Sequence, residues 1–417
     1  MNFLATFLYD LGLQFYSLCV TIASLWDQKA MQWKNGRKNL FRKIRLALND
    51  NEERIWFHCA SVGEFEQARP VMEAYRIHYP SHKIVLTFFS PSGYELRKNY
   101  AGADYIFYLP LDTASNANKL ISLFQPLLAV FTKYEFWFHH LKELRKNDIP
   151  VILICGIFRK NQLFFKWYGK TWSTVLHFFS HILVQDQSSC QLLRTFGLKN
   201  VEIVGDTRFD RVWQIAQQKT DLPAIERFKE GDKLFVAGST WKADERLIKI
   251  LTNRFDQWKW VIVPHETDST HLTELKGLFP LAVFYSQLLT SKVGNFKILI
   301  VDEVGLLSSI YRYADMGYIG GGFGKGIHNV LEAAVYGIPI IFGPNHQKFI
   351  EAADLLKSRA AKSIKNAEEL STAFENFAPG ASGGERNKIY FEKNKGATEK
   401  IMNYIKSINS DIAALPG

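Results

Sequence analysis

Cysteine is scarce in this sequence of 417 residues, which contains four of them. They are Cys19, Cys59, Cys155 and Cys190. The cysteines lie far apart and form no C-x-x-C pair, so their spacing indicates neither a zinc-binding module nor the disulfide framework of a small secreted domain. Isolated thiols are typical of proteins that work in a reducing, cytoplasmic compartment.

Acidic residues are also in the minority. The chain has 41 Asp and Glu against 51 Lys and Arg, which gives a formal net charge of +10. This excess favours anionic partners, whether nucleic acid, phosphorylated sugars or an anionic membrane surface. The sequence contains no recognisable RNA- or DNA-binding motif, so we expect no nucleic-acid partner.

A content of 47% hydrophobic and 22% charged residues is that of a folded protein, and the length suffices for two domains.

One long apolar run occupies residues 3–26 and is interrupted by Asp10 and Gln14. It can span a bilayer, which needs ~20 residues, and the basic residues that follow it would stay cytoplasmic. These are Lys29, Lys34, Arg37, Lys38, Arg42, Lys43 and Arg45. Because they follow the run and no convincing cleavage site is present, we expect a signal-anchor and not a removed signal peptide. The alternative is a helix that lies in the membrane interface or packs on the protein, since Asp10 is costly at mid-membrane.

From residue 54 onward, short apolar runs alternate with segments of helical period. This alternation predicts buried parallel strands covered by helices on both faces. The expected strands are 55–59, 83–89, 105–109, 127–131, 151–154, 182–184 and 201–204, and, after a polar stretch at 214–221, 233–237, 260–263, 282–285, 298–301, 318–319 and 339–342. We therefore expect a membrane anchor with its basic flank at 1–48, Rossmann-like domains at 49–212 and 222–380, and a polar helical tail at 381–417.

The segment 318–355 reads YIGGGFGKGIHNVLEAAVYGIPIIFGPNHQKFIEAADL. It predicts a strand, a glycine loop, a helix from Asn329 to Gly337 and a second strand. Backbone N–H groups in such a loop suit an anionic group such as a phosphate. The loop is neither a Walker A motif, because Gly326 follows Lys325, nor a G-x-G-x-x-G motif. The simpler interpretation is that Asn329 and Glu332 only cap the helix.

Two glutamates follow predicted strands of the first domain, and ligands of open α/β sheets bind at the carboxyl ends of strands. Glu64 lies in the string H-C-A-S-V-G-E and can act as a general base there, or it can form a capping box with Ser61. Glu135 lies in T-K-Y-E-F-W, where the alternative is an acid favoured by a helix N-terminus. Arg208, in G-D-T-R-F-D, offers a cation at the same edge, although it can also be an ordinary surface arginine.

The string G-G-x-F-x-x-G-x-H-N-x-L-E-A-A-x-x-G-x-P-x-x-F-G-P resembles the nucleotide-binding segment of bacterial 3-deoxy-D-manno-octulosonic acid (Kdo) transferases. H-C-A-S-V-G-E, T-K-Y-E-F-W and G-D-T-R-F-D are similar to that family's A-S-V-G-E, E-T-E-L-W and G-x-x-K-F-D motifs, and the likeness follows the family's order over residues 56–355. It implies a GT-B fold of the α/β class, in which two Rossmann-like domains face a central cleft and an N-terminal helix associates with the membrane.

The resemblance also implies roles for individual residues. Glu64 would take the proton of the acceptor hydroxyl, Glu135 would assist the transition state, and Arg208 would offset charge on the leaving phosphate. The residues implied to bind the nucleotide are Pro264, His265, Val304, Gly305, Leu306, Gly321, Gly322, Asn329, Val330, Leu331 and Glu332. The sequence departs from the family at Ile157, where an arginine is usual, and at Leu306, where M-G-E has its acid.

The reaction implied is transfer of Kdo from CMP-Kdo to a lipid A precursor, lipid IVA, during lipopolysaccharide core synthesis at the cytoplasmic face of the inner membrane. A single in-line displacement would invert the anomeric carbon. The sequence has no D-x-D pair to hold a metal-bound nucleotide diphosphate, and we expect no metal and no cofactor. Two rival hypotheses are another GT-B enzyme that uses a nucleotide sugar on a different lipid acceptor, and a basic membrane-tethered scaffold without enzymatic activity.

Overall fold

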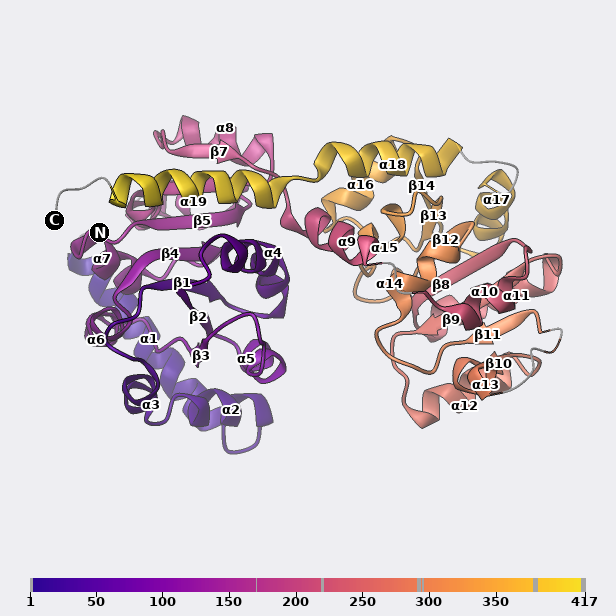
Figure 1. Cartoon of the computed structure of the whole chain (residues 1–417), viewed down its shortest axis with the longest axis horizontal. Helices are drawn as coiled ribbons and strands as arrows, with labels where there is room; N and C mark the ends of the chain where they lie inside the picture. The colour runs from indigo at the N-terminus through magenta and orange to yellow at the C-terminus, as the bar shows by residue number, and fades with distance from the viewer. Residues whose placement is uncertain are drawn as a thin grey trace. The chain divides into compact units, whose positions relative to one another are not determined.

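The computed structural model describes residues 3–169, 171–218, 221–290, 294, 296–377 and 382–413. The chain divides into two compact units (Figure 1). Unit 1 comprises Met1–Arg211 together with Gly396–Gly417, and unit 2 comprises Val212–Lys395. The C-terminal end of the chain therefore belongs to the same unit as the N-terminal end.

Unit 1 is built on a seven-stranded parallel sheet with the order β3-β2-β1-β4-β5-β6-β7. Its strands are β1 (Arg54–Cys59), β2 (Lys83–Phe88), β3 (Tyr105–Tyr108), β4 (Pro126–Thr132), β5 (Val151–Gly156), β6 (His181–Val184) and β7 (Val201–Ile203). Every residue of β1 is buried, as the continuous apolar run predicts for a strand covered on both faces. The unit is thus a Rossmann-like α/β domain.

Helices cover both faces of this sheet. They are α1 (Phe3–Ala23), α2 (Gln28–Gly36), α3 (Leu40–Ala47), α4 (Val62–His78), α5 (Pro91–Arg97), α6 (Ala114–Phe124), α7 (Phe138–Lys146), α8 (Gln187–Thr195), the start of α9 (Thr207–Gln217) and α19 (Ala397–Ala413), with short 3-10 turns η1 (Leu163–Phe165), η2 (Trp167–Gly169) and η3 (Trp172–Phe178). Side chains of β1 alternate between two cores: Trp56 lies in one, whereas Ile55 and Phe57 lie in the other.

Unit 2 repeats this architecture with a seven-stranded parallel sheet of order β10-β11-β9-β8-β12-β13-β14. Its strands are β8 (Leu234–Thr240), β9 (Lys259–Pro264), β10 (Val283–Phe284), β11 (Ile298–Ile300), β12 (Met316–Ile319), β13 (Ile340–Phe342) and β14 (Ala361–Ser363). Its helices are α10 (Pro223–Lys229), α11 (Lys242–Arg254), α12 (Ser269–Leu278), α13 (Tyr285–Thr290), α14 (Leu307–Ile310), η4 (Tyr311–Tyr313), α15 (Leu331–Ala334), α16 (Ile350–Lys357), α17 (Ala367–Phe377) and α18 (Ser382–Asn394). Two parallel Rossmann-like units of this kind confirm the GT-B-like α/β fold.

The helix expected from Asn329 to Gly337 is shorter than predicted. The α-helical part is α15 alone, from Leu331 to Ala334, and Asn329 Oδ1 accepts a hydrogen bond from Leu331 N at 3.2 Å. After Ala334 the backbone closes in i to i+3 bonds and reaches Gly337 in a left-handed conformation, with φ of +67°. The α-helix therefore ends three residues before Gly337, because the last turn is of 3-10 type.

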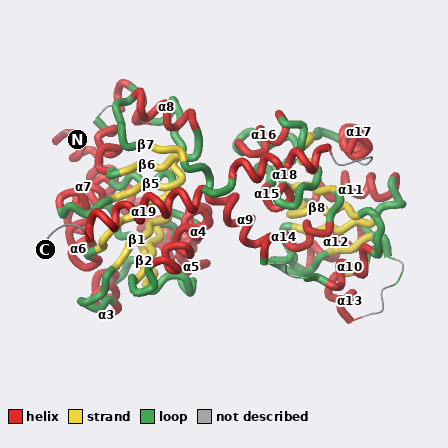
Figure 2. Tube along the Cα trace, turned by 45° about the horizontal axis from the view of Figure 1, so that its top comes forward, coloured by secondary structure: helices red, strands yellow, loops and turns green. Residues whose placement is uncertain are grey.

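The tail expected to be polar returns to unit 1. Ile401, Met402 and Ile405 of α19 are buried in the same core as Ile55 and Phe57. Figure 2 shows α19 across the strands of unit 1. The entry of this helix is held by Asp210, whose carboxylate accepts hydrogen bonds from Gly396 N at 2.5 Å and Thr398 N at 2.6 Å. Ile401 and Ile405 lie one helical turn apart and Met402 lies beside Ile401, so these side chains form one apolar stripe that packs on unit 1.

Candidate functional site

Glu64 lies one turn into α4, directly after the carboxyl end of β1. Ser61 is the N-cap of this helix and its Oγ accepts a hydrogen bond from Gly63 N at 3.3 Å. The Ser61 hydroxyl also donates to Glu64 Oε2. The two alternatives for this motif are therefore compatible, because Ser61 caps the helix while its hydroxyl orients a carboxylate that remains partly exposed.

Glu135 lies between β4 and α7 and is 7% exposed. Its Oε2 accepts a hydrogen bond from Trp137 Nε1 at 2.6 Å and lies 3.0 Å from His58 Nε2. His58 is fully buried in β1, so Glu135 has a buried polar partner on the neighbouring strand. A buried carboxylate requires such partners, since desolvation alone would penalise its charge.

The tautomer of His58 follows from its contact with Glu135. An ionised carboxylate can only accept, so a proton on His58 Nε2 suits this contact, and the indole N–H of Trp137, 3.1 Å from the same nitrogen, donates to Glu135 Oε2 at 2.6 Å. In that tautomer His58 Nδ1 accepts from the Thr87 hydroxyl at 2.8 Å, while Thr87 Oγ1 accepts from Trp56 Nε1 at 2.8 Å. We therefore assign the proton to His58 Nε2, which donates it to Glu135.

Glu64 and Glu135 lie at the same edge of the sheet. Both carboxylates lie close enough to Cys59 to affect the pKa of its thiol. Burial raises this pKa, and the negative charges of the two glutamates raise it further. Cys59 is the last residue of β1, and its Sγ lies 3.7 Å from Oγ1 of Thr132, the last residue of β4. The carboxyl ends of two adjacent parallel strands thus bring the two predicted glutamates together.

Arg208 is held beside α4. Its Nε donates to Asp206 Oδ2 at 2.8 Å, and Asp206 Oδ1 accepts from Gln67 Nε2 at 3.2 Å. Thr207 Oγ1 donates to the backbone oxygen of Gln67 at 2.6 Å. Since Gln67 is one helical turn from Glu64, the loop after β7 places the predicted cation near the predicted base. Arg208 is neutralised in part by Asp206.

In unit 2 the glycine loop is fixed to the N-terminus of α11 by Asp244, which is fully buried. The carboxylate accepts hydrogen bonds from Tyr318 OH at 2.7 Å and from the backbone N of Gly321 and Trp241, both at 3.0 Å. Burial raises the pKa of Asp244 although these donors lower it. Asp244 therefore organises the loop that follows β12.

Close backbone packing explains two glycines of this loop, and a left-handed backbone explains a third. A Cβ on Gly322 would lie 2.6 Å from the Cα of Gly343, and a Cβ on Gly320 would lie 2.2 Å from the backbone O of Ser239. Gly321 has a φ of +87°. These positions need glycine for the fold of the loop itself, whatever the loop binds.

Glu332 joins two segments that are far apart in the sequence. Its Oε2 accepts from Ser308 Oγ at 2.9 Å and its Oε1 accepts from Asn329 Nδ2 at 3.1 Å. Ser308 follows the predicted contact segment 304–306, so this segment and residues 329–332 lie side by side. Burial raises the pKa of Glu332, and its two hydrogen-bond donors oppose that shift. Val304 is 86% exposed, whereas Val330 and Leu331 are buried and can meet a ligand only through their backbone.

Three rings stack beside the glycine loop. His265 follows β9 and stacks on both Trp241 and His328, with ring centroids 4.8 Å and 4.3 Å away, whereas the centroids of Trp241 and His328 lie 6.4 Å apart. Trp241 Nε1 donates to His328 Nε2 at 3.0 Å. Burial, together with the neighbouring His265, lowers the pKa of His328 to about 4, so its ring is neutral at pH 7. Pro264 is buried directly before this stack.

Three residues other than glycine adopt left-handed backbone conformations at the strand ends that carry the site. They are Lys133 after β4, Cys155 in β5 and Ser239 in β8, with φ of 68°, 55° and 51°. Such conformations cost of order 1–3 kcal/mol each and cluster at functional sites. They lie at the carboxyl ends of these strands, which is the end at which open α/β sheets bind ligands. Ile157, after β5, is buried and faces the interior.

Sequence reasoning missed several residues that build these sites. They are His58, Trp137, Asp206, Trp241, Asp244 and His328. His58 could have been suspected as the one polar ring inside the apolar run of β1. Trp137 and Asp206 lie two residues from the side chains that they hold, Glu135 and Arg208. Trp241, Asp244 and His328 have no local signal, because their partners include residues of another strand or loop.

The sequence matches, over residues 32–211, the profile of a family described as "3-Deoxy-D-manno-octulosonic-acid transferase (kdotransferase)". It is 27% identical over 360 residues to a 3-deoxy-D-manno-octulosonic acid transferase of Chlamydia muridarum, with 82% of this chain and 81% of the relative covered. The same identity extends over 326 residues of the Aquifex aeolicus enzyme of that name, with 76% and 84% covered.

A bifunctional glycosyltransferase/methyltransferase of Fusobacterium nucleatum subsp. nucleatum is also 27% identical, over 388 residues and 87% of this chain. This chain spans 59% of that relative's length. Among solved structures, UDP-GlcNAc 2-epimerase from Neisseria meningitidis bound to UDP-GlcNAc is similar with a TM-score of 0.61 and 13% identity, covering 85% of this chain and 100% of that chain. At such low identity the likeness shows the fold alone.

Proposed function

This chain is a glycosyltransferase of the 3-deoxy-D-manno-octulosonic acid (Kdo) transferase family, and from that premise we propose that it moves Kdo from CMP-Kdo to the lipid A precursor lipid IVA with inversion. The observation that carries the proposal is the pair of carboxylates, Glu64 and Glu135, at the carboxyl edge of one sheet. One is partly exposed and the other is buried, which gives two carboxylates distinct environments. Such pairs are suited to different roles in one reaction.

Glu64 is the proposed general base. It removes the proton of the acceptor hydroxyl as the oxygen forms a bond to the anomeric carbon of Kdo. The bond from that carbon to the phosphate oxygen breaks in the same step, and CMP leaves with the electron pair. Support comes from the position of Glu64 after β1, from its exposure, and from the Ser61 hydroxyl that orients Oε2.

Glu135 is proposed to stabilise positive charge that develops on the sugar ring in the transition state. Its hydrogen bonds from Trp137 and His58 hold the carboxylate in one orientation, so no reorganisation is needed during the reaction. Arg208 is proposed to offset the charge of the departing phosphate. Its ion pair with Asp206 fixes the direction of the guanidinium.

Unit 2 is proposed to hold the donor. Glu332 can accept hydrogen bonds from the ribose hydroxyls, and backbone N–H groups of the glycine loop can bind the phosphate. The exposed ring of His265, stacked on Trp241, offers a flat surface to the cytosine ring. Gly305, Leu306 and the residues near Asn329 would complete the nucleotide contacts.

The acceptor is half apolar and half phosphate, so we propose that the protein works on the cytoplasmic face of the inner membrane. Helix α1 is long and apolar enough to cross a membrane by length and composition, with a mean hydropathy of 1.4 over its 18-residue window. The net charge of +10 suits both the phosphates of the acceptor and an anionic membrane surface.

A donor and acceptor screen tests the proposal. The full-length protein is incubated with lipid IVA and either CMP-Kdo or UDP-GlcNAc, and products are identified by mass spectrometry. Lipid IVA that gains one or more Kdo residues from CMP-Kdo only is the expected result. Transfer or epimerisation of UDP-GlcNAc would instead favour the second candidate, a GT-B enzyme that uses another nucleotide sugar.

A further inference from the structure

Helix α1 packs on unit 1 along its whole length. The partly covered positions recur every three or four residues, which is one stripe of an α-helix. They are Ala5, Thr6, Tyr9, Asp10, Leu13, Ser17, Val20, Thr21 and Ala23. At 1.5 Å per residue the 21 residues of the helix extend about 31 Å, so the covered stripe is nearly as long as a bilayer core is thick.

Polar contacts fix the first half of this stripe. Tyr9 OH donates to Asp112 Oδ2 at 2.6 Å, and Asp10 Oδ1 lies 2.6 Å from His139 Nε2. Asp112 is fully buried and also accepts from His139 N at 3.0 Å and His140 N at 2.8 Å. Asp10 is the single charged residue of the α1 sequence, and it is directed toward the protein. The acid that would be costly in a membrane therefore has a partner in unit 1.

Aromatic contacts hold the second half of α1 through Tyr16, which lies at the edge of the covered stripe and is 41% exposed. Tyr16 contacts Trp33 and Phe89, with ring centroids 5.8 Å and 6.3 Å away. Arg37 lies over Trp33 at 4.0 Å and donates from Nε to Leu109 O at 2.9 Å and from NH2 to Phe89 O at 2.8 Å. Burial lowers the pKa of Arg37 to about 9. The helix is thus held to the sheet domain at both of its halves.

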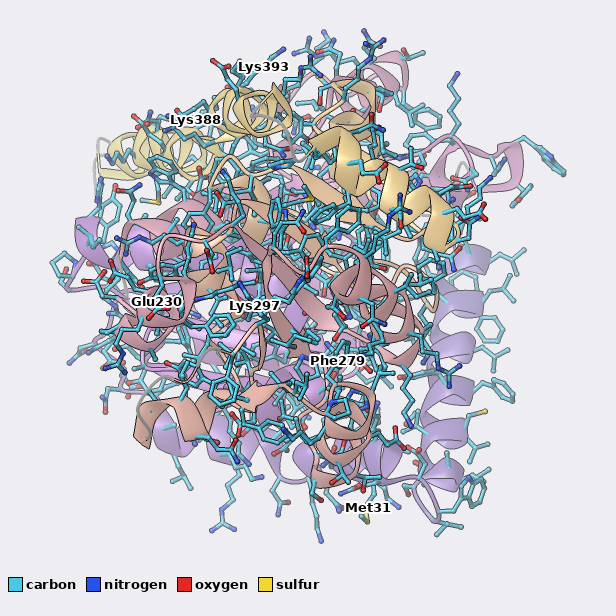
Figure 3. The ribbon with its side chains drawn as sticks, turned by 90° about the vertical axis from the view of Figure 1, so that its right-hand side faces the viewer. Met31, Glu230, Phe279, Lys297, Lys388 and Lys393 are labelled. Atoms are coloured by element: carbon cyan, nitrogen blue, oxygen red, sulfur yellow. The ribbon has the colours of Figure 1, made fainter. Side chains whose placement is uncertain are left out.

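The opposite side of α1 is apolar and exposed. Its large side chains are Phe3, Leu4, Phe7, Leu8, Leu11, Phe15, Leu18 and Ile22, followed by Leu25 and Trp26. In Figure 3, α1 is the pale violet helix at the right-hand edge, and the side chains on its outer side project away from the protein. An apolar face of this extent marks an interaction site, because monomeric soluble proteins rarely expose one.

Cations accompany this apolar face on the next two helices, of which α2 packs directly against α1. The exposed ones are Lys29, Lys34, Lys38, Arg42, Lys43 and Arg45. Among the residues that the structure describes, no carboxylate forms an ion pair with any of these six side chains. Unpaired cations beside an apolar face are complementary to anionic lipid headgroups above acyl chains.

We infer that α1 does not cross the bilayer but lies flat in one leaflet, docked on unit 1, with its outer face among the acyl chains and the cations of α2 and α3 at the headgroups of anionic lipid. A spanning α1 would have to leave the domain along its covered stripe and break the contacts of Tyr9, Asp10 and Tyr16. The inference does not depend on which reaction the enzyme catalyses.

A second contact with the same membrane surface is available near the N-terminal half of α1. Tyr9 contacts Trp172 at the start of η3, with ring centroids 4.9 Å apart. The short turns before η3 expose Trp167 by 89% and Tyr168 by 62%. Tryptophan and tyrosine prefer the membrane–water interface, so these two rings are suited to the depth at which a flat α1 would lie.

Depth measurements separate a flat helix from a spanning one. Leu4, Leu11 and Leu18 lie seven residues apart on the exposed face, and Cys59, Cys155 and Cys190 are buried. Each leucine is replaced by cysteine in a Cys19→Ser background, labelled with a fluorophore, and quenched in vesicles by lipids brominated at shallow or deep acyl positions. The flat helix predicts the same shallow depth at all three positions. A deep position 11 between shallow positions 4 and 18 would overturn the inference.

Topology gives an independent readout. An epitope tag at the N-terminus of the full chain is tested for protease access in sealed inside-out membrane vesicles. The flat helix predicts that the tag is digested together with the rest of the protein, because both lie on one side. Protection of the tag while the body is digested would show that α1 crosses the membrane and would contradict the inference.

The identity of the partner is tested with vesicles. Binding to vesicles of phosphatidylethanolamine with phosphatidylglycerol should exceed binding to phosphatidylcholine vesicles by at least about 10-fold and should fall with salt. The variant Leu11→Glu/Phe15→Glu should lose binding by about 10-fold or more. The matched control Ile77→Glu/Leu281→Glu, which charges two exposed apolar residues elsewhere, should bind normally. Equal loss of vesicle binding in both variants would reject lipid as the partner. So would a wild-type protein that binds no vesicles but forms a dimer, if Leu11→Glu/Phe15→Glu converts that dimer to monomer.

Discussion

His58 Nε2 and Glu135 Oε2 lie 3.0 Å apart, on a strand and on the loop that follows its neighbour, and both residues are buried. The histidine is fixed on its other side by Thr87, which in turn receives the indole N–H of Trp56. A chain of hydrogen bonds therefore runs from the core of unit 1 to a carboxylate at the functional edge. Its consequence is that the position of Glu135 depends on a residue that does not itself reach the substrate.

Loss of this positioning contact should lower turnover more than it lowers binding. We expect His58→Ala to reduce kcat on the order of 100-fold, because a reacting group displaced by about 1 Å loses that much. The dissociation constant for CMP, measured by calorimetry, should stay unchanged. His58→Gln, whose amide N–H can replace the Nε2 donor, should recover part of kcat. A purely structural role for His58 would instead show as lowered thermal stability with no recovery by glutamine.

Glu332 should matter for the nucleotide and not for folding. Burial raises its pKa, which means that the charged form is disfavoured in the folded protein. Glu332→Gln removes that penalty and keeps an oxygen that can accept from Ser308 or Asn329, so we expect the free energy of unfolding to stay equal or rise. The affinity for CMP should fall by about 10-fold, the cost of about one hydrogen bond to a charged group. Unchanged CMP affinity would argue against a contact with the ribose.

Acid should destabilise unit 2 through His328. The pKa of this histidine is about 4 in the folded protein, owing to burial and to His265, against about 6.5 in an unfolded chain. Between these values the unfolded chain binds the proton and the folded one does not. The free energy of unfolding should therefore fall as the pH is lowered from about 6.5 to about 4. His328→Gln, compared with wild type by urea unfolding at pH 7.5 and pH 5, should show a smaller fall; an equal fall would assign the effect to other groups.

Two glycines of the loop should respond differently to alanine. A Cβ on Gly322 would lie 2.6 Å from the backbone of Gly343, whereas a Cβ on Gly324 would lie 3.6 Å from its nearest neighbour, Gly321 O. We expect Gly322→Ala to lower the free energy of unfolding by about 1–3 kcal/mol and to weaken CMP binding, because the loop must move. Gly324→Ala should change stability by less than about 0.5 kcal/mol. Denaturant unfolding measures the free energy of unfolding of both variants. An equal change in the two variants would contradict the packing argument.

The strands were predictable because buried parallel strands appear as short apolar runs. All thirteen expected strands are present, from β1 to β13, with ends that either coincide with the prediction or differ from it by at most three residues. The strand β14 (Ala361–Ser363) escaped prediction because its sequence, A-K-S, has no apolar run. The return of α19 to unit 1 escaped it as well, since the buried apolar residues of that helix, Ala397, Ile401, Met402 and Ile405, are dispersed among polar ones.

Some residues of the candidate site were predictable from the sequence and others were not. Glu64, Glu135 and Asn329 to Glu332 could be proposed from local strings at strand ends. His58, Asp244 and the stacked ring of His328 could not, because each acquires its role from a partner distant in the chain, such as Glu135 or Gly321. Burial and partner distance are properties of the fold, so only the structure supplies them.

The central claim is that Glu64 deprotonates the acceptor, and one measurement tests it most directly. Wild-type protein and Glu64→Gln are incubated with CMP-Kdo and lipid IVA, the Kdo added is counted by mass spectrometry, and CMP binding is measured on the same samples. We predict that wild type adds Kdo, and that Glu64→Gln binds CMP normally but transfers Kdo at least about 100-fold more slowly, as expected for loss of a general base. Transfer at the wild-type rate by Glu64→Gln would contradict the account.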